Sequence, residues 1–172
     1  NEPAAKDDAK NMSKIFIGAC AGGHLELAKS YEGCYDYDVF DKALVYACKS
    51  DNKDLVEYIL SIIYFVYNHS ENAFNIACQR GNIEIINFLI NDGYYNYNNG
   101  LEGACEGGHN EVIKIMITLG ATDYNGGLVG ACRGGHNDII KIMIDLGATD
   151  YNGGLVGACR GGHIEIVNLM IS

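Results

Sequence analysis

The chain has 172 residues and a net charge of −10, from 22 acidic and 12 basic residues. This acidic balance, without any basic run, excludes binding to a nucleic-acid backbone, which repels a negatively charged surface. No apolar run reaches the roughly 18 residues that a membrane-spanning helix needs, since the longest, residues 59–67, is interrupted by Ser61. No signal-peptide pattern stands at the start of the sequence.

Polar residues dominate residues 1–13, where five side chains are charged. This composition predicts a polar N-terminal cap or a disordered leader. Further along, no proline-rich or serine-rich linker interrupts the sequence, because its single proline is Pro3. We therefore expect residues 14–172 to form one domain.

A repeat fills this domain. The dipeptide Ala-Cys recurs with its cysteines separated by 28, 30, 27, 27 and 27 residues, and residues 119–136 recur unchanged as residues 146–163. A period near thirty is typical of stacked supersecondary units that touch only their neighbours. The anchor cysteines of the six repeats are Cys20, Cys48, Cys78, Cys105, Cys132 and Cys159. The repeats span about residues 14–37, 38–67, 68–97, 98–124, 125–151 and 152–172.

Each repeat consists of two short segments around a glycine turn. In the fifth repeat the second segment, residues 137–146, has apolar residues at helical spacing. This pattern predicts a largely buried helix of about ten residues that ends at a left-handed Gly147. The first segment, residues 127–134, is rich in glycine, which costs about 1 kcal/mol per helical site relative to alanine. Its helicity must therefore come from packing, and the paired glycines are interpreted as turns.

The fifth repeat resembles the ankyrin repeat. Residues 131–136, Ala-Cys-Arg-Gly-Gly-His, and the helix that follows up to Ala148 match the family's alanine pair, Gly-His turn, apolar helix and closing Gly-Ala. The resemblance covers about Ile15 to the end and implies an all-α solenoid of six stacked helix-turn-helix repeats. Residues 126–129, Gly-Gly-Leu-Val, replace the family's Thr-Pro-Leu-His, and the repeats are about six residues shorter than the usual 33. The β-hairpin fingers are therefore expected to be shortened or absent.

Four anchor cysteines are followed four residues later by a histidine, which raises the question of metal binding or catalysis. Zinc needs four ligands around one ion, but each repeat supplies two, and Asn52 and Asn82 replace the histidine in the second and third repeats. A catalytic thiol needs one special environment, whereas this pair is repeated with the scaffold. We expect no metal, no cofactor and no enzymatic activity, and a histidine that ties adjacent backbone groups together.

The cysteines also indicate a compartment. Stacked helices lie about 8–10 Å apart, whereas a disulfide needs Cα atoms within about 7 Å. Equivalent anchor cysteines are therefore expected to be free, buried thiols, which suits a reducing, cytoplasmic environment. Cys34 lies outside the anchor position and is interpreted as an ordinary loop or surface thiol.

Function is expected where side chains vary on a constant scaffold. The residue after the anchor cysteine changes along the array, and so do the residues two and three positions before it. The ankyrin resemblance implies that a concave face with such positions, together with the loop tips, binds protein. A tyrosine that recurs once per repeat either packs between repeats or forms a recognition stripe. The candidate partner-binding residues are Tyr46, Lys49, Gln79, Glu102, Glu106, Arg133, Arg160, Tyr124 and Tyr151.

The predicted function is a non-catalytic scaffold that binds a partner protein, with no nucleic acid, membrane or small-molecule substrate. The alternative is a viral or host-targeting adaptor that presents a host protein to a ubiquitin ligase, because short, near-identical repeats are similar to the ankyrin arrays of giant DNA viruses of amoebae. The last predicted helix lacks the polar outer face of a terminal repeat, because its residues include Ile166, Val167, Met170 and Ile171. We expect the array to continue or to self-associate there.

Overall fold

The computed structural model describes residues 2–31, 33, 35–62 and 71–171, and the regular structure within these residues is entirely helical. The helices are α1 (Glu2–Ala21), α2 (Leu25–Ser30), α3 (Tyr37–Lys49), α4 (Lys53–Ile62), α5 (Glu71–Arg80), α6 (Ile83–Asn91), α7 (Tyr97–Gly107), α8 (Asn110–Thr118), α9 (Tyr124–Gly134), α10 (Asn137–Asp145), α11 (Tyr151–Gly161) and α12 (Ile164–Ile171). The predicted all-α fold is confirmed.

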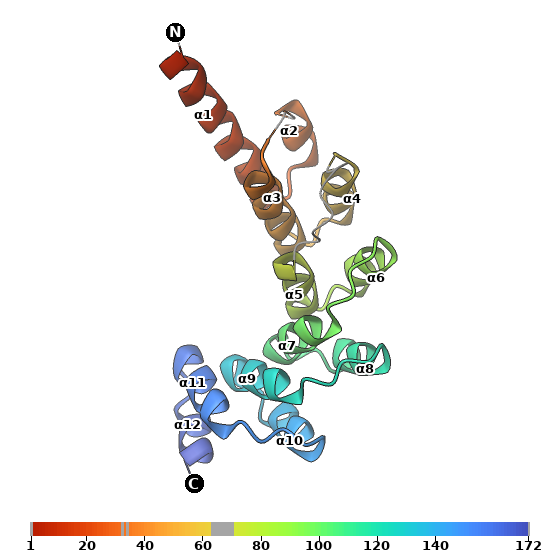
Figure 1. Ribbon diagram of the computed structural model, residues 1–172, viewed down its shortest axis with the longest axis vertical. Coiled ribbons are helices and arrows are strands. Elements are labelled where there is room, and N and C mark those ends of the chain that lie inside the picture. The colour runs from red at the N-terminus through yellow and green to blue at the C-terminus, as the bar shows by residue number, and fades with distance from the viewer. Residues whose placement is uncertain (1, 32, 34, 63–70, 172) are drawn as a thin grey trace. The chain divides into compact units, whose positions relative to one another are not determined.

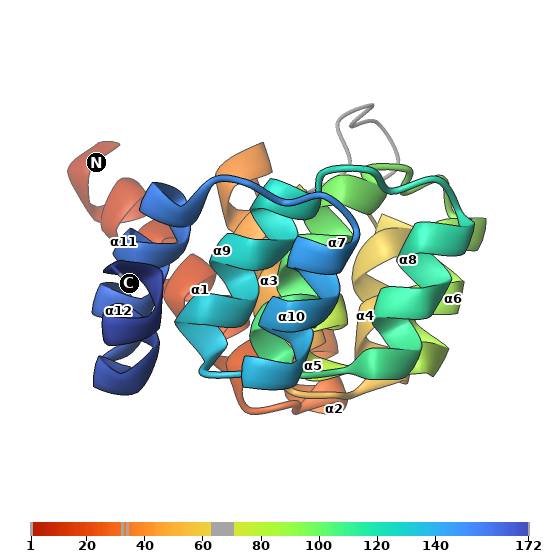
Figure 2. The same ribbon diagram turned by 90° about the horizontal axis from the view of Figure 1, so that it is seen from below.

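The chain divides into two compact units, residues 1–73 and 74–172. In the first unit α1 packs against α2 and α3, and α3 packs against α4. In the second unit α7, α9 and α11 lie side by side, and α8, α10 and α12 each pack against the helix that precedes them (Figure 1). The connections from α8 to α9 and from α10 to α11 run along one edge of the second unit (Figure 2). Each repeat is therefore a helix, a tight turn and a second helix.

The second helices form where the apolar pattern predicts them. In α10 the residues Ile139, Ile140 and Met143 are buried against the first helices, while Asp138 occupies the first turn, where the helix dipole favours a carboxylate. Gly147 follows the helix with a φ of 108°, a left-handed conformation that favours glycine. The predicted helix and its glycine stop are confirmed.

The first helices begin earlier than the sequence indicates. Helix α9 starts at Tyr124, because the side chain of Asp123 accepts a hydrogen bond from the backbone N–H of Gly126 and caps the helix. The recurring tyrosine is therefore a helical residue and not a loop residue. The pair Gly126-Gly127 lies inside the helix, so the interpretation of every glycine pair as a turn was wrong.

Close contact of α9 with the preceding first helix and with α10 explains why glycines are retained within this helix. A methyl group on Gly130 or Gly134 would collide with the backbone carbonyl oxygen of Glu102 or Glu106 in the preceding repeat. A methyl group on Gly127 would lie 2.5 Å from the sulfur of Met143. Only a residue without Cβ allows this approach, and the packing gained offsets the poor helix propensity of glycine.

Two further expectations concern the leader and the fingers. Helix α1 begins at Glu2, so residues 2–13 are continuous with the first helix of the first repeat. The connections at residues 92–96, 119–123 and 146–150 contain no strand, which agrees with shortened fingers. Among the described helices, none is both long and apolar enough to cross a bilayer. The expectation of a single domain from residue 14 onward stays a prediction.

Candidate partner-binding surface

Apart from the tyrosines, the candidate residues of the second unit lie at two positions of the first helix of each repeat. One position is the third residue before the anchor cysteine, and the other is the first residue after it. These positions are four residues apart, so they share one face of the helix. We term them the variable row. From α5 to α11 the variable row consists of Asn75, Gln79, Glu102, Glu106, Val129, Arg133, Val156 and Arg160.

Arg133 joins two carboxylates of the preceding repeat. Its Nη1 lies 2.7 Å from Oε2 of Glu106, and its Nη2 lies 3.3 Å from Oε1 of Glu102. The three side chains are between 20% and 32% exposed, so solvent screens their attraction only in part. The structure therefore brings three of the predicted site residues together in one ion cluster. Their role in partner binding stays a prediction.

Arg160 occupies the equivalent position one repeat later but has different neighbours. The residues that correspond to Glu102 and Glu106 are now Val129 and Arg133. Within the described part of the chain, the exposed Arg160 side chain takes part in no hydrogen bond or ion pair. Val156, one turn earlier on the same face, is 50% exposed. Arg160 therefore presents an uncompensated positive charge to solvent.

The first unit carries the candidates Tyr46 and Lys49 on α3. Both side chains are exposed, and Nζ of Lys49 lies 5.3 Å from the centre of the Tyr46 ring. A cation–π contact of this kind contributes about 0.5–1 kcal/mol at an exposed site. Gln79, on α5 of the second unit, is half-buried.

The tyrosine ladder combines packing with exposure. Tyr97 opens α7, and its ring packs edge-to-face against Phe74 of the preceding first helix, with the ring centres 6.5 Å apart. Tyr124 is half-buried at the start of α9, and Tyr151 is exposed at the start of α11. Tyr67 and the side chain of Tyr37 lie outside the described residues. Packing between repeats therefore holds for Tyr97, while Tyr151 is available for contact.

The recurring histidine ties consecutive repeats together, as the sequence predicts. In the last three repeats the ring Nε2 lies 2.9–3.1 Å from a backbone carbonyl oxygen in the last turn of the preceding first helix, where no helical donor remains. The pairs are His109 with Gln79, His136 with Glu106, and His163 with Arg133.

The asparagines that replace histidine in earlier repeats act differently. Oδ1 of Asn52 accepts a hydrogen bond from the backbone N–H of Leu55, and Oδ1 of Asn82 accepts one from Ile85. These asparagines cap their own second helices. Asn52 also donates from Nδ2 to the backbone carbonyl oxygen of Gly23 in the preceding repeat, at 2.9 Å. His109 stands at the same cap position without a side-chain cap, so the histidine makes only the bond between repeats.

Five of the six anchor cysteines are buried thiols that form no disulfide. Burial raises the pKa of Cys20, Cys48 and Cys105 to about 12 and that of Cys132 to about 11, so these thiols stay protonated. Cys159 is exposed, which corrects the expectation that it is buried, because no following first helix covers this side of α11 in the described residues.

Metal-ligating side chains do not converge in the part of the chain that the structure describes, where no group of three or more His, Cys, Asp or Glu residues could hold an ion. Histidine and cysteine of one repeat belong instead to two different contacts, a bond between repeats and a buried core. Cys34 lies outside the described residues.

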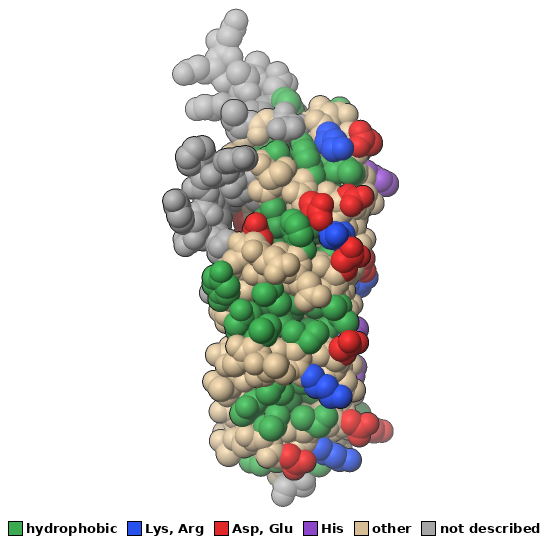
Figure 3. Space-filling model, turned by 90° about the vertical axis from the view of Figure 1, so that its right-hand side faces the viewer, with side chains coloured by type: hydrophobic (Ala, Val, Ile, Leu, Met, Phe, Trp, Pro, Cys, Tyr) green, Lys and Arg blue, Asp and Glu red, His purple; other side chains and the backbone are tan. Residues whose placement is uncertain are grey.

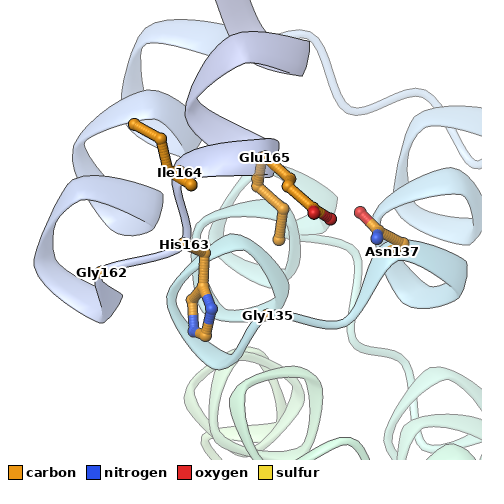
Figure 4. Close-up of a pocket in the computed structure, with 7 residues that line it drawn as sticks. Gly135, Asn137, Gly162, His163, Ile164 and Glu165 are labelled. Carbon is orange, nitrogen blue, oxygen red and sulfur yellow. The ribbon is translucent and has the colours of Figure 1, made fainter.

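A shallow pocket lies where the turns of the last two repeats meet. It is lined by Gly135, Asn137, Gly162, His163, Ile164, Glu165 and Ile166. Figure 4 shows the His163 ring pointing toward Gly135, with the side chains of Asn137 and Glu165 directed toward one another across the opening. Because His163 is already engaged with the Arg133 carbonyl, we interpret this pocket as the joint between two repeats.

Sequence reasoning did not identify the asparagine after the recurring tyrosine. Oδ1 of Asn98 accepts hydrogen bonds from the backbone N–H groups of Thr122 and Asp123, at 2.8 and 3.0 Å. Asn125 holds the next loop in the same way. The signal was the dipeptide Tyr-Asn, which recurs at residues 97–98, 124–125 and 151–152. These asparagines fix the loop tips relative to one another.

Stacked helix pairs with a repeated turn and a repeated core define a helical repeat protein. A family model of three ankyrin repeats matches residues 15–100, half of the chain. The chain belongs to the ankyrin-repeat family. The crystal structure of the human ASB11 ankyrin repeat domain has a similar fold, with a TM-score of 0.56 and 19% sequence identity over 91% of this chain and 81% of that chain. A search of curated proteins found no match. Ankyrin repeats are in general non-enzymatic modules for protein–protein interaction.

Proposed function

We propose that this chain is a non-catalytic scaffold that binds a partner protein through the variable row and the loop tips. The observation that supports the proposal is the contrast between scaffold and variable row in the last three repeats. Anchor cysteines, histidines and all glycines of the first helix but one, which is Asn99 in the fourth repeat, are the same in these repeats. The variable row, by contrast, is Glu102 and Glu106 on α7 but Val156 and Arg160 on α11. Side chains that differ on an unchanged backbone suit recognition of one particular partner.

The ion pairs and exposed side chains of this surface indicate which of its residues are available to a partner. The carboxylates of Glu102 and Glu106 are engaged by Arg133, so they are less available to a partner. Arg160 and the neighbouring Val156 are exposed. A cation beside an apolar side chain suits a partner surface that carries a carboxylate next to an apolar residue.

The state of the anchor cysteines supports a reducing, intracellular site of action. Cys20, Cys48, Cys78, Cys105 and Cys132 are buried and form no disulfide. Oxidising compartments favour disulfides in small repeats of this size, and thiols that form no disulfide at every described anchor position suit the opposite environment.

Site-specific photo-cross-linking tests the proposed function. A photo-reactive amino acid is placed at Arg160, at Val156 or at Lys141, which is exposed on the second helix α10 and serves as the control. Each variant is irradiated in an extract of the source cells, and cross-linked proteins are identified by mass spectrometry. We expect a shared partner from positions 160 and 156 and none from position 141. The same product from position 141, or no product from position 160, would contradict the proposal.

A further inference from the structure

The connection between α6 and α7 carries an exposed aromatic side chain at a position where the next two connections have none. Tyr95 is 70% exposed, the largest exposed fraction of any large hydrophobic side chain in the described residues. Threonine stands at the equivalent position of the next two connections, Thr122 and Thr149. The Tyr95 ring rests edge-to-face on Tyr97, with centres 6.5 Å apart and planes at 83°. Tyr97 in turn packs against Phe74, so Tyr95 is positioned without being covered.

Acidic residues stand in this connection and in the next two along the array. Residues 91–96, 118–123 and 145–150 contain no lysine or arginine, and their aspartates, all exposed, are Asp92, Asp123, Asp145 and Asp150. Asp92 and Asp145 stand at the C-terminal ends of α6 and α10, where the helix dipole disfavours a carboxylate. No basic residue occupies the last turn of α6, α8 or α10. The negative charge at this edge is therefore not compensated locally.

Hydrogen bonds bring the aromatic ring and the acidic loops together. Asn98, next to Tyr97, accepts the backbone N–H groups of Thr122 and Asp123, so the connection before α9 is tied beside the tyrosine pair. Asn125 ties Thr149 and Asp150 to the start of α9 in the same manner. Figure 2 shows the connections before α9 and α11 along the same edge of the second unit. Figure 3 shows hydrophobic side chains in patches over one face of the molecule, with most of the acidic and basic side chains near one margin of that face.

We propose that this loop edge, defined as Tyr95 with Asp92, Asp123 and Asp150, binds an arginine-containing basic segment of the partner protein. This inference rests on the proposed function and names the chemistry of one part of the partner. A guanidinium stacks on an aromatic face and is more weakly hydrated than an ammonium, so it gains more from Tyr95 than lysine does. Its remaining donors then pair with the neighbouring carboxylates. The complementary charge steers the encounter.

The probe is a labelled peptide of about ten residues in which arginine and glycine alternate, compared with its lysine counterpart by fluorescence anisotropy at low salt. Three variants preserve the fold. Tyr95→Thr installs the residue that the next two loops already carry, and Tyr95→Phe keeps the ring. Asp123→Asn keeps the helix cap, because Asn96 caps α7 with the same bond that Asp123 makes to α9.

The wild-type chain is expected to bind the arginine peptide more tightly than the lysine peptide. Tyr95→Thr should weaken the arginine peptide about fivefold and remove this preference, Tyr95→Phe should retain it, and Asp123→Asn should weaken both peptides equally. Absence of binding, or equal binding of both peptides that is unaffected by Tyr95→Thr, would overturn the inference.

The two proposals fail separately. Arg160 lies at the opposite end of α11 from the loop edge, so cross-linking at position 160 reports on the variable row and not on Tyr95. If peptide recognition is lost while the cross-link from position 160 remains, only the proposal for the loop edge is contradicted. Loss of the cross-link defeats the proposed function.

Discussion

Nη1 of Arg133 lies 2.7 Å from Oε2 of Glu106, and the two residues occupy the same position in consecutive repeats. Arg160 occupies the equivalent position one repeat after Arg133, so in this case both equivalent side chains are positively charged. Two arginines inside an identical stretch of eighteen residues therefore have opposite roles. Arg133 pairs with two carboxylates of the preceding repeat, whereas Arg160 has no such pair in the described residues, and we propose that it contacts the partner.

Reversing the charge of each arginine side chain in turn distinguishes these two roles. Arg133→Glu places a third carboxylate beside Glu102 and Glu106, so the free energy of unfolding should fall by about 1–2 kcal/mol. Arg160→Glu places a carboxylate beside Arg133 and should change it by less than about 0.5 kcal/mol. Urea unfolding followed by circular dichroism at low ionic strength measures both. Equal losses from the two variants would show that the ion cluster does not join the repeats.

The close approach of first helices predicts opposite effects of one substitution at two equivalent glycines. Gly130→Ala forces a methyl group against the Glu102 carbonyl, and we expect a loss of about 2 kcal/mol despite alanine's better helix propensity. Gly18 occupies the same position in the first repeat, and a methyl group there meets nothing within 4 Å. Gly18→Ala should therefore raise stability by up to about 1 kcal/mol. If Gly130→Ala is also stabilising in urea unfolding, the helices are not in contact there.

The buried thiols predict a loss of stability in alkali. Burial holds the pKa of Cys48 and Cys105 at about 12, above the ordinary value of 9.0. The folded chain thus keeps protons that the unfolded chain releases, so this contribution is complete below about pH 9 and is lost as the pH rises toward 12. Cys105→Ala should flatten the fall in stability with pH, and Cys159→Ala, at the exposed anchor, should not. Urea unfolding at several alkaline pH values checks this, and identical slopes for both variants would refute it.

The asparagine that follows the recurring tyrosine allows a matched comparison between Asn98, which holds a loop, and Asn152. Asn98→Ala removes the acceptor for the Thr122 and Asp123 backbone N–H groups, and we expect a loss of about 1 kcal/mol. Asn152 is the equivalent residue on α11 and has no hydrogen-bond partner in the described residues. Asn152→Ala should therefore leave the unfolding midpoint unchanged. Faster hydrogen exchange at Thr122 and Asp123 in Asn98→Ala provides a local readout, and protection equal to wild type would contradict the assignment.

Local signals predicted much of the fold. Helix α10 and its glycine stop follow from apolar spacing and from the preference for left-handed glycine after a helix, which act within a few residues. The start of α9 was placed too late, because the helical role of Gly126 and Gly127 depends on capping by Asp123 and on contact with another repeat. Propensity alone disfavours those glycines.

The candidate surface was less predictable for the same reason. The positions of the variable row follow from comparing repeats, but the pairing of Arg133 with two glutamates depends on how one repeat is placed on the next. The exposure of Cys159 and Arg160 depends on the absence of a covering helix among the described residues. Interactions between repeats therefore decide which members of an identical sequence are structural and which are available.

The affinity of the partner that cross-links at position 160 tests the central claim most directly. Calorimetry with the purified partner compares wild type with Arg160→Glu and with Lys141→Glu, the matched reversal on a second helix. We predict that Arg160→Glu weakens binding about tenfold or more while Lys141→Glu leaves it unchanged. Equal affinity of all three chains, or a loss confined to Lys141→Glu, would contradict the claim that the variable row binds the partner.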